Sequence, residues 1–585
     1  MELKRRESFL IFVGFVSLIL ILLGSIFSAV HQDKKLPYLL SSEYEDLLIR
    51  PIVKEDGLYF FIPSDMDTED LFLRSEKTIY CDDRIVNNAA ITPFFEGEHS
   101  YKIAGQDTAI YFYQSENVPS LFIDTVRKDM DFVNDDKTNE TEVRIRSYSK
   151  QGEKILSMYP ISIKGRGNNS FKTEKKSYTL TFDEDCDVLS MGAAGKWILV
   201  PSSSDTTLIN NMVVSRFAKE TGLYWTPDCE YADVYFDGEY GGLYLVYEKP
   251  QISDERLAIG KDGVLLKREL SSRLEIVDNG FLTEKGNVIE ISDPKAVSSL
   301  HKQQIVRKVQ AMEDALFDLN SDDWKQVIDI DSWARCYLID ELFDNLDAGI
   351  ASAYFYIGED GKFYRGPVWD YDTLMWDPAR SMIADTYQRE PYSVNDYYYL
   401  LNKREEFLTR VREIYEEEYR PLIISFVTEK IDAISVSIDA ARAMDGARWD
   451  HHFSQSSVML FKEYLKNKAE FMEEYWDHKE NFCKILVQKD FFYLTYITEK
   501  GSSIAKAYDI DLSLLKQDEY HYADTLDPVD LDAPVYEDQI LVNETFDIAE
   551  EQSSDVGGLG LLNMAFLALF GFLFLILGIA KIIER

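Results

Sequence analysis

Residues 161–182 have the sequence ISIKGRGNNSFKTEKKSYTLTF, and this stretch indicates how the central part of the chain folds. Strand-like segments on both sides of a polar turn predict a hairpin, with Gly165 and Gly167 in the turn. Glycine lets backbone N–H groups approach a phosphate closely, and a lysine that enters the next strand can neutralise its charge. An ordinary hairpin with a solvated basic flank would have the same pattern.

Helices and strands are mixed around this hairpin. Apolar residues at helical spacing predict a helix over 205–221. A β-hairpin is expected around the turn at residues 237–238, followed by a helix over 331–343 and a second hairpin that turns at 358–361. The sequence therefore predicts an α+β fold here.

Two segments rich in aspartate follow the later elements. Asp347 comes just after a predicted helix, where a carboxylate can accept a proton from a substrate hydroxyl or simply cap the helix. The sequence WDYD at 369–372 ends the second hairpin. If that strand continues, Asp370 and Asp372 share a face and could bind a cation together, although solvated strands carry such pairs too.

The order of these parts is typical of protein-kinase-like phosphotransferases, although the motifs HRD, DFG and GxGxxG are absent. At these residues the sequence resembles the spore-coat protein H (CotH) kinase family. The resemblance covers about residues 118–480. It is carried by IKGRGNNSF, KKSYTLTF, DTTLINN, VYFDGEYGGLYLVYE and DNLDAGIASAYFY…VWDYD, which occur in this order.

The resemblance implies roles for several residues. Lys176, with Lys175 as the alternative, would contact the phosphates of ATP. Asp347 would orient or deprotonate the acceptor hydroxyl, and Asp370 would bind Mg²⁺ with the help of Asp372. We expect Arg166 and the amides near Gly167 to hold phosphate, while Glu248 would either line the adenine or pair with the lysine.

Two positions depart from the expected pattern. Kinases place an asparagine five residues after the catalytic aspartate as a second magnesium ligand, and Ser352, a weaker ligand, stands there. Asn210 replaces an arginine that is common in the family. A catalytically inactive protein, or an enzyme that transfers another group, is therefore an alternative.

The rest of the chain divides into further parts. A β-rich, sandwich-like module is expected over 36–117, before the atypical kinase-like domain over 118–480, whose C-terminal part is helical from about 395. The acidic segment 481–555 is expected to be a tether.

Both ends carry an uncharged apolar run, 9–30 and 559–579, long enough for a transmembrane helix. A cleaved signal peptide is the alternative for the first run. Basic residues at 4–6, 581 and 585 predict that the short ends, 1–8 and 580–585, are cytoplasmic and the main domain extracytoplasmic.

Composition excludes some classes of protein. With 103 acidic and 62 basic residues, the net charge of −41 disfavours a nucleic-acid binder. The five cysteines lie far apart and give neither a zinc motif nor a disulfide framework, so most are expected to be small buried apolar residues.

The leading hypothesis is a membrane-tethered kinase that uses ATP and Mg²⁺ to phosphorylate Ser or Thr of cell-surface or envelope proteins. The alternatives are an inactive kinase-like surface protein that binds envelope polymers or proteins, and an enzyme of the same fold that transfers a nucleotidyl group or glutamate.

Overall fold

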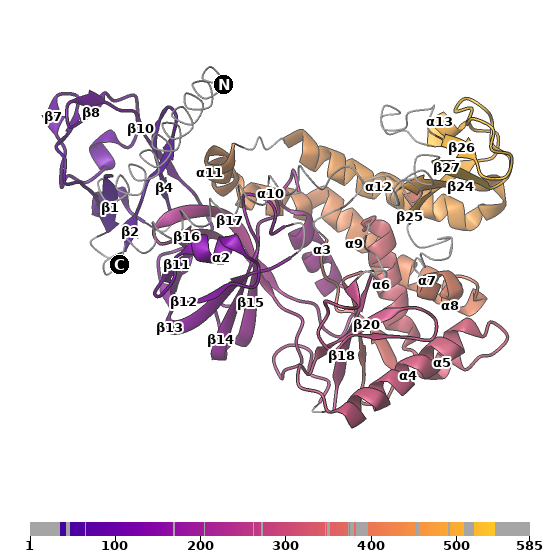
Figure 1. Ribbon diagram of the computed structural model, residues 1–585. Helices are drawn as coiled ribbons and strands as arrows, with labels where there is room; N and C mark the ends of the chain where they lie inside the picture. The colour runs from indigo at the N-terminus through magenta and orange to yellow at the C-terminus, as the bar shows by residue number, and fades with distance from the viewer. Residues whose placement is uncertain are drawn as a thin grey trace, which may run out of the picture. The chain divides into compact units, whose positions relative to one another are not determined.

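The protein is a mixed α/β chain with a β-rich N-terminal region and a helical C-terminal region, as Figure 1 shows. This computed structural model describes residues 36–41, 47–64, 66–167, 170–203, 205–260, 262–270, 273–345, 347, 351–371, 374, 380–381, 396–450, 455–489, 492–507 and 520–543. The chain forms two compact units, Met1–Pro378 with Asn395–Glu470, and Ala379–Val394 with Phe471–Arg585.

The N-terminal module, residues 36–117, consists of three small sheets in the orders β2-β1-β5, β10-β4-β3 and β7-β6-β8-β9. Buried residues from all three sheets, such as Leu39, Phe60 and Ile79, belong to one apolar core. The strands are β1 (Tyr38–Ser41), β2 (Leu48–Ile49), β3 (Ile52–Lys54), β4 (Gly57–Ile62), β5 (Leu71–Arg74), β6 (Ile79–Cys81), β7 (Arg84–Ile85), β8 (Tyr101–Ile103), β9 (Gln106–Asp107) and β10 (Ile110–Gln114).

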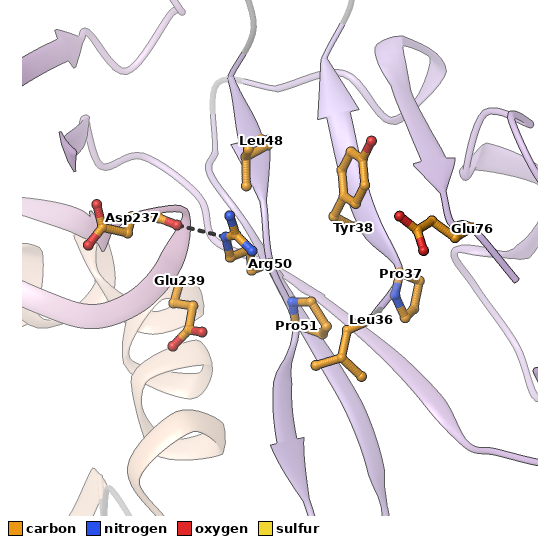
Figure 2. A pocket seen from close by; sticks show the side chains of 9 residues that line it. All are labelled: Leu36, Pro37, Tyr38, Leu48, Arg50, Pro51, Glu76, Asp237 and Glu239. Carbon is orange, nitrogen blue, oxygen red and sulfur yellow. Dashed lines mark hydrogen bonds between the residues drawn. The ribbon is translucent and has the colours of Figure 1, made fainter. Parts of the chain in front are cut away.

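Arg50 joins this module to the rest of the first unit. Its backbone N–H donates to the Gly238 carbonyl oxygen at 2.8 Å, and its Nε donates to the Asp237 carbonyl oxygen at 3.0 Å (Figure 2). A pocket of about 580 Å³ lies at this junction, with Tyr38 and Glu239 among its lining residues. Arg50 is therefore engaged in holding the turn at residues 237–238.

A closed barrel forms the centre of the first unit, with strand order β11-β12-β13-β14-β15-β17-β16. Its interior is filled by apolar side chains such as Leu180, Trp197 and Val246. The strands are β11 (Ser120–Thr125), β12 (Glu140–Tyr148), β13 (Lys154–Gly165), β14 (Tyr178–Cys186), β15 (Ala194–Val200), β16 (Cys229–Phe236) and β17 (Glu239–Glu248), with helices α2 (Met130–Asp135) and α3 (Asn210–Lys219). The hairpin predicted around residues 237–238 is confirmed.

Helix α3 begins five residues later than the sequence predicted. The Asp205 carboxylate accepts hydrogen bonds from the backbone N–H groups of Thr207 and Asn210, each at 2.8 Å. Leu208 has φ 61°, which an α-helix does not allow. The segment before α3 is therefore a tight capping turn.

The remainder of the first unit combines a sheet of order β19-β20-β18-β21-β22 with helices. The predicted helix over 331–343 is confirmed as α6, and the second hairpin as β21 and β22. These strands are β18 (Val264–Glu269), β19 (Phe281–Leu282), β20 (Val288–Asp293), β21 (Ala353–Ile357) and β22 (Phe363–Arg365). The helices are α4 (Ser299–Phe317), α5 (Trp324–Val327), α6 (Ile330–Leu342), α7 (Asp396–Leu401), α8 (Glu405–Ile414), α9 (Arg420–Ser425), α10 (Ile431–Ser437), α11 (Asp439–Trp449) and, as far as Glu470, α12 (Gln455–Asp477).

The second unit contains a five-stranded sheet of order β23-β25-β24-β27-β26. The expectation of a tether is wrong for the described residues between 481 and 543, because β24 and β25 pair as antiparallel strands over Phe482–Glu499. Strand pairing outweighs the acidic composition of this segment. Its elements are β23 (Arg380–Ser381), β24 (Phe482–Lys489), β25 (Phe492–Glu499), α13 (Ile504–Ala507), β26 (Tyr520–Tyr522) and β27 (Gln539–Asn543).

Two predictions about the whole chain can be compared with the structure. All five cysteines have free, buried thiols, as expected. Among the described residues, no helix combines the length and the apolar character that crossing a membrane requires. Both predicted spans, 9–30 and 559–579, lie outside the described residues.

Candidate functional site

The barrel carries three cations, Arg166, Lys196 and Lys249, that have no carboxylate partner within the described part of the chain. Lys196 lies in β15, Lys249 directly follows β17, and Arg166 directly follows β13. β15 and β17 pair with Trp197 opposite Glu248, so the same register continued by one residue brings Lys196 opposite Lys249. In a protein with a net charge of −41, such a group of cations favours an anionic ligand.

Arg256 fixes the backbone beneath the two lysines. Its guanidinium is buried and donates to the carbonyl oxygens of Lys196 at 3.1 Å and Lys249 at 2.6 Å. The same guanidinium lies 5.0 Å from the Trp197 ring, and its Nε lies 3.5 Å from Glu248 Oε1. Arg256 is therefore a positioning residue that holds β15 and the end of β17 in one arrangement.

Lys249 has an unusual electrostatic environment. Burial, together with the positive charges of Lys196, Lys295, Arg166 and Lys267, lowers the pKa of Lys249 to about 7. Lys267 is paired with Glu269 at 2.7 Å and with Glu290 at 2.8 Å, and Lys295 is paired with Glu290 at 3.0 Å. An anion bound beside Lys249 would restore its charge.

Trp369 connects this cationic group to the predicted metal-binding segment. Its ring stacks on Tyr247 of β17 at 4.8 Å between centroids, and the Arg166 guanidinium lies 5.6 Å from the same ring. The next residue, Asp370, is half-buried. The backbone N–H of the residue after it, Tyr371, donates a hydrogen bond to Asn211 Oδ1 of α3 at 2.9 Å. Asp370 is thus held between residues that are anchored to the barrel and to α3.

The prediction that Asp370 lies in a strand is wrong. β22 ends at Arg365, and Asp370 has φ 70°, in the left-handed region. Asp370 is therefore not on a strand face that it could share with Asp372, and Asp372 lies outside the described residues.

Asp347 lies five residues beyond the end of α6. Its backbone N–H donates to Asn345 Oδ1 at 3.1 Å, and its carbonyl oxygen accepts from the Ala351 N–H at 3.1 Å. The residue is open to solvent. Desolvation by the surrounding protein and, next, the negative charge of Asp370 raise the pKa of Asp347 to about 6, against an opposing effect of Arg273.

Asp347 and Asp370 form a suitable donor set for a hard divalent cation. Their charges interact unfavourably, and Glu269 adds a further negative charge near Asp347. A cation between carboxylates removes this repulsion, and oxygen donors are those that Mg²⁺ prefers. The residues present therefore fit a magnesium ion at Asp370, with the Asp347 carboxylate close enough to interact with its charge.

Lys175 and Lys176, which the sequence predicted to contact phosphate, have contacts different from those of Lys196 and Lys249. Lys175 is buried, and its Nζ lies 2.7 Å from both Asp445 Oδ1 and the Leu243 carbonyl oxygen. Lys176 Nζ donates to the carbonyl oxygens of Phe171 at 2.8 Å and Thr173 at 3.3 Å. It lines a pocket of about 330 Å³ whose described lining residues include neither aspartate of the site. The phosphate-binding role of either lysine stays a prediction.

The other predicted residues are placed as follows. Glu248 accepts a hydrogen bond from the Asp228 N–H at 2.7 Å, burial raises its pKa, and its ion-pair partner is Arg256 rather than a lysine. Gly167 has φ 81°, and a Cβ there would lie 2.1 Å from Ser170 Oγ, so the turn requires glycine. Ser352 is half-buried with φ 50° and immediately precedes β21.

A comparison with known families identifies the family of this chain. The family model described as CotH kinase protein matches residues 161–475, which include Arg166, Lys196, Lys249, Asp347 and Asp370. The chain belongs to the CotH kinase family. A search of curated proteins finds none that matches the chain.

Sequence reasoning about this CotH kinase missed Lys196, Lys249 and Arg256. Each lies in or near a strand-like segment without a phosphate-binding motif, so the sequence gives no sign that β15 and β17 would pair. Lys249 could have been found from the sequence, because a lysine that directly follows the largely apolar strand GGLYLVYE is a candidate for a partly buried charge.

Proposed function

We propose that this CotH kinase transfers the γ-phosphate of ATP to Ser or Thr hydroxyls of cell-surface or envelope proteins. The observation that carries the proposal is that a group of cations on the barrel lies near a pair of carboxylates. Arg166 and Lys196, which have no carboxylate partner among the described residues, contribute positive charge at Lys249. Trp369 links this group to the electrostatically coupled pair of Asp370 and Asp347. A phosphotransferase needs positive charge for the phosphates and carboxylates for the metal and the acceptor.

The cations would hold the phosphates. Arg166, Lys196 and Lys249 can donate charge-assisted hydrogen bonds to phosphate oxygens, and Arg256 keeps the two lysines in register. Bound Mg²⁺ would neutralise charge that develops on the phosphates. Asp370 is the residue that we assign to hold this ion.

Asp347 would act on the acceptor hydroxyl. A general base works best when its pKa lies near the operating pH. The pKa of about 6 for Asp347 is closer to neutrality than that of an ordinary aspartate, while the residue stays accessible to a protein substrate. Asp347 would orient the hydroxyl and accept its proton as the oxygen attacks phosphorus.

We also propose that the protein is anchored in the membrane by both apolar runs, with the main domain extracytoplasmic. The support is the length of each run, 9–30 and 559–579, and the basic residues at the outer ends of the chain. Substrates would then be proteins of the cell surface or envelope.

A transfer assay tests the proposed chemistry. The full chain in detergent is incubated with Mg²⁺, a mixture of envelope proteins, and ATP labelled either on the γ-phosphate or on the adenine ring. We expect γ-label alone on protein, lost in Asp370→Ala and in Asp347→Ala but kept in Glu470→Gln, an exposed carboxylate of α12. Transfer that survives in both aspartate variants would contradict the proposal.

Ser352 favours a second candidate, an inactive kinase-like protein that binds envelope polymers or proteins, because serine is a weaker magnesium ligand than asparagine. Absence of label from either form of ATP, together with no thermal stabilisation by ATP, would favour this binding protein. Adenine label on protein would instead indicate nucleotidyl transfer, and transfer of glutamate would need labelled glutamate to be detected.

A further inference from the structure

We propose that Cys81, Asp82 and His99 form a binding site for Zn²⁺, or for a transition-metal ion of similar ligand preference, in the N-terminal module. One ligand atom from each residue, the Cys81 Sγ, an Asp82 carboxylate oxygen and a His99 ring nitrogen, lies within 4.8 Å of the others. The module precedes residues 161–475, which match the kinase family. The inference is therefore independent of the proposed phosphotransfer.

Pairing of β6 with β8 assembles the three residues. Cys81 is the last residue of β6 and lies opposite Tyr101, the first residue of β8. Asp82 begins the turn into β7, and its backbone N–H donates to the Ser100 carbonyl oxygen at 3.0 Å. This pairing brings His99 beside Asp82, although 17 positions separate them in the sequence.

The distances fit a small ion after a modest adjustment. Asp82 Oδ2 lies 2.7 Å from His99 Nδ1 and 4.0 Å from Cys81 Sγ. Bonds to zinc of about 2.0–2.3 Å in a tetrahedral arrangement separate two ligand atoms by roughly 3.5 Å. Shifts of the order of 1 Å in the side chains of Asp82 and His99 would place all three atoms around one ion.

The remaining polar atoms of the site are already held by the backbone. His99 Nε2 lies 3.0 Å from the Glu96 carbonyl oxygen, and Asp82 Oδ1 accepts from the Ser100 N–H at 3.0 Å. Histidines and carboxylates that bind metals are usually oriented in this way through their second polar atom. His99 Nδ1 and Asp82 Oδ2 are thus the atoms directed toward the site.

Exposure differs among the three residues in a way that suits an open metal site. Cys81 is buried, while the Asp82 side chain is 54% exposed and that of His99 is 20% exposed. An ion can therefore enter from the Asp82 side, where water can supply a fourth ligand. Sulfur and nitrogen donors favour zinc over magnesium or calcium. Binding replaces the protons of the Cys81 thiol and of His99 Nδ1 by bonds to the metal, and both protons go to the solvent.

Metal titrations on the full chain in detergent, after treatment with a chelator, test the proposal. Zn²⁺ binding is measured by calorimetry, and Co²⁺ binding by the thiolate-to-cobalt charge-transfer absorption. We expect one Zn²⁺ that His99→Gln weakens by at least about tenfold. The cobalt band should disappear in Cys81→Ser and persist in Cys483→Ser, which removes a buried thiol in the second unit.

Circular dichroism and thermal unfolding without metal show whether each variant is folded. Should Cys81→Ser unfold, His99→Gln still tests the site, because its side chain is partly exposed. Equal Zn²⁺ affinity of wild type and His99→Gln, or a cobalt band that survives in folded Cys81→Ser, would overturn the proposal and leave Asp82 and His99 as an ion pair that holds the turn. Neither readout involves phosphotransfer, so the two proposals fail separately.

Discussion

Lys175 and Lys249 belong to the same barrel region but have opposite surroundings. Lys175 is buried and lies 2.7 Å from both the Asp445 carboxylate and the Leu243 carbonyl oxygen. Lys249 is half-buried, and its electrostatic neighbours in the described structure are the cations Lys196, Lys295, Arg166 and Lys267. Burial lowers the pKa of both lysines. The Asp445 carboxylate opposes this shift for Lys175, whereas the positive charges of neighbouring cations add to it for Lys249.

The difference separates a structural cation from one that suits a ligand. Removing an ammonium from water is unfavourable unless a carboxylate or other acceptors replace the lost hydration. Asp445 and Leu243 do this for Lys175, so its charge is satisfied within the fold. Among the described residues nothing comparable serves Lys249, and a polyphosphate would supply the missing negative charge.

The largest effect is expected from breaking the buried pair. Asp445→Asn leaves Lys175 buried without its counter-ion, and we expect the free energy of unfolding to fall by about 3–5 kcal/mol. Urea denaturation of the first unit measures this loss. Glu470→Gln, which removes an exposed partner of Lys466, should change it by less than about 0.5 kcal/mol. A loss below about 1 kcal/mol in Asp445→Asn would contradict the structural role of the pair.

The next effect concerns Lys249 and is expected in ligand binding rather than in stability. Lys249→Met removes a charge-assisted hydrogen bond to phosphate, worth about 1.5–3 kcal/mol, so the Kd for ATP should rise roughly 10–150-fold. The free energy of unfolding should stay the same or increase, because a poorly compensated charge is removed. Calorimetry with Mg²⁺ and ATP measures the Kd, and Lys466→Met serves as the control. Unchanged affinity would remove Lys249 from the proposed site.

The sequence predicted much of this arrangement, but not the comparison between the two lysines. Local patterns correctly predicted the hairpin at 237–238, helix α6 and the hairpin of β21 and β22, because each depends on periodicity or on a turn signal within about 20 residues. The roles of Lys175 and Lys249 depend on partners far along the chain, such as Asp445, 270 positions away from Lys175. Sequence spacing carries no information about such pairs.

A similar limit explains Asp370 and the second unit. The second hairpin was expected to continue through 369–372, but β22 ends at Arg365 and Asp370 adopts a left-handed backbone conformation. The acidic composition of 481–555 suggested a tether, yet β24 finds partners in both β25 and β27. Long-range strand pairing decided the structure where local composition was ambiguous.

A smaller effect should appear in the pH dependence of stability. The pKa of Lys249 is about 7 in the folded protein, compared with about 10.4 for an unfolded chain. Between these values the unfolded chain binds more protons, so the free energy of unfolding rises with pH and falls as pH drops toward 7. From about pH 7 to about pH 10, the free energy of unfolding of wild type should therefore rise relative to that of Lys249→Met. Parallel curves would show that Lys249 keeps an ordinary pKa.

The smallest effect is proton uptake on nucleotide binding. It tests whether the Lys249 side chain contacts the ligand directly. At about pH 8, above its pKa of about 7, most of Lys249 is neutral in the free protein. Phosphate beside it would raise that pKa, so binding of ATP should take up a fraction of one proton from the buffer. Calorimetry in two buffers of different ionisation enthalpy measures the uptake, and subtracting the value for Lys249→Met removes contributions from ATP and from Asp347. Equal uptake by both proteins would mean that the ligand does not contact Lys249, even if the mutation weakens binding.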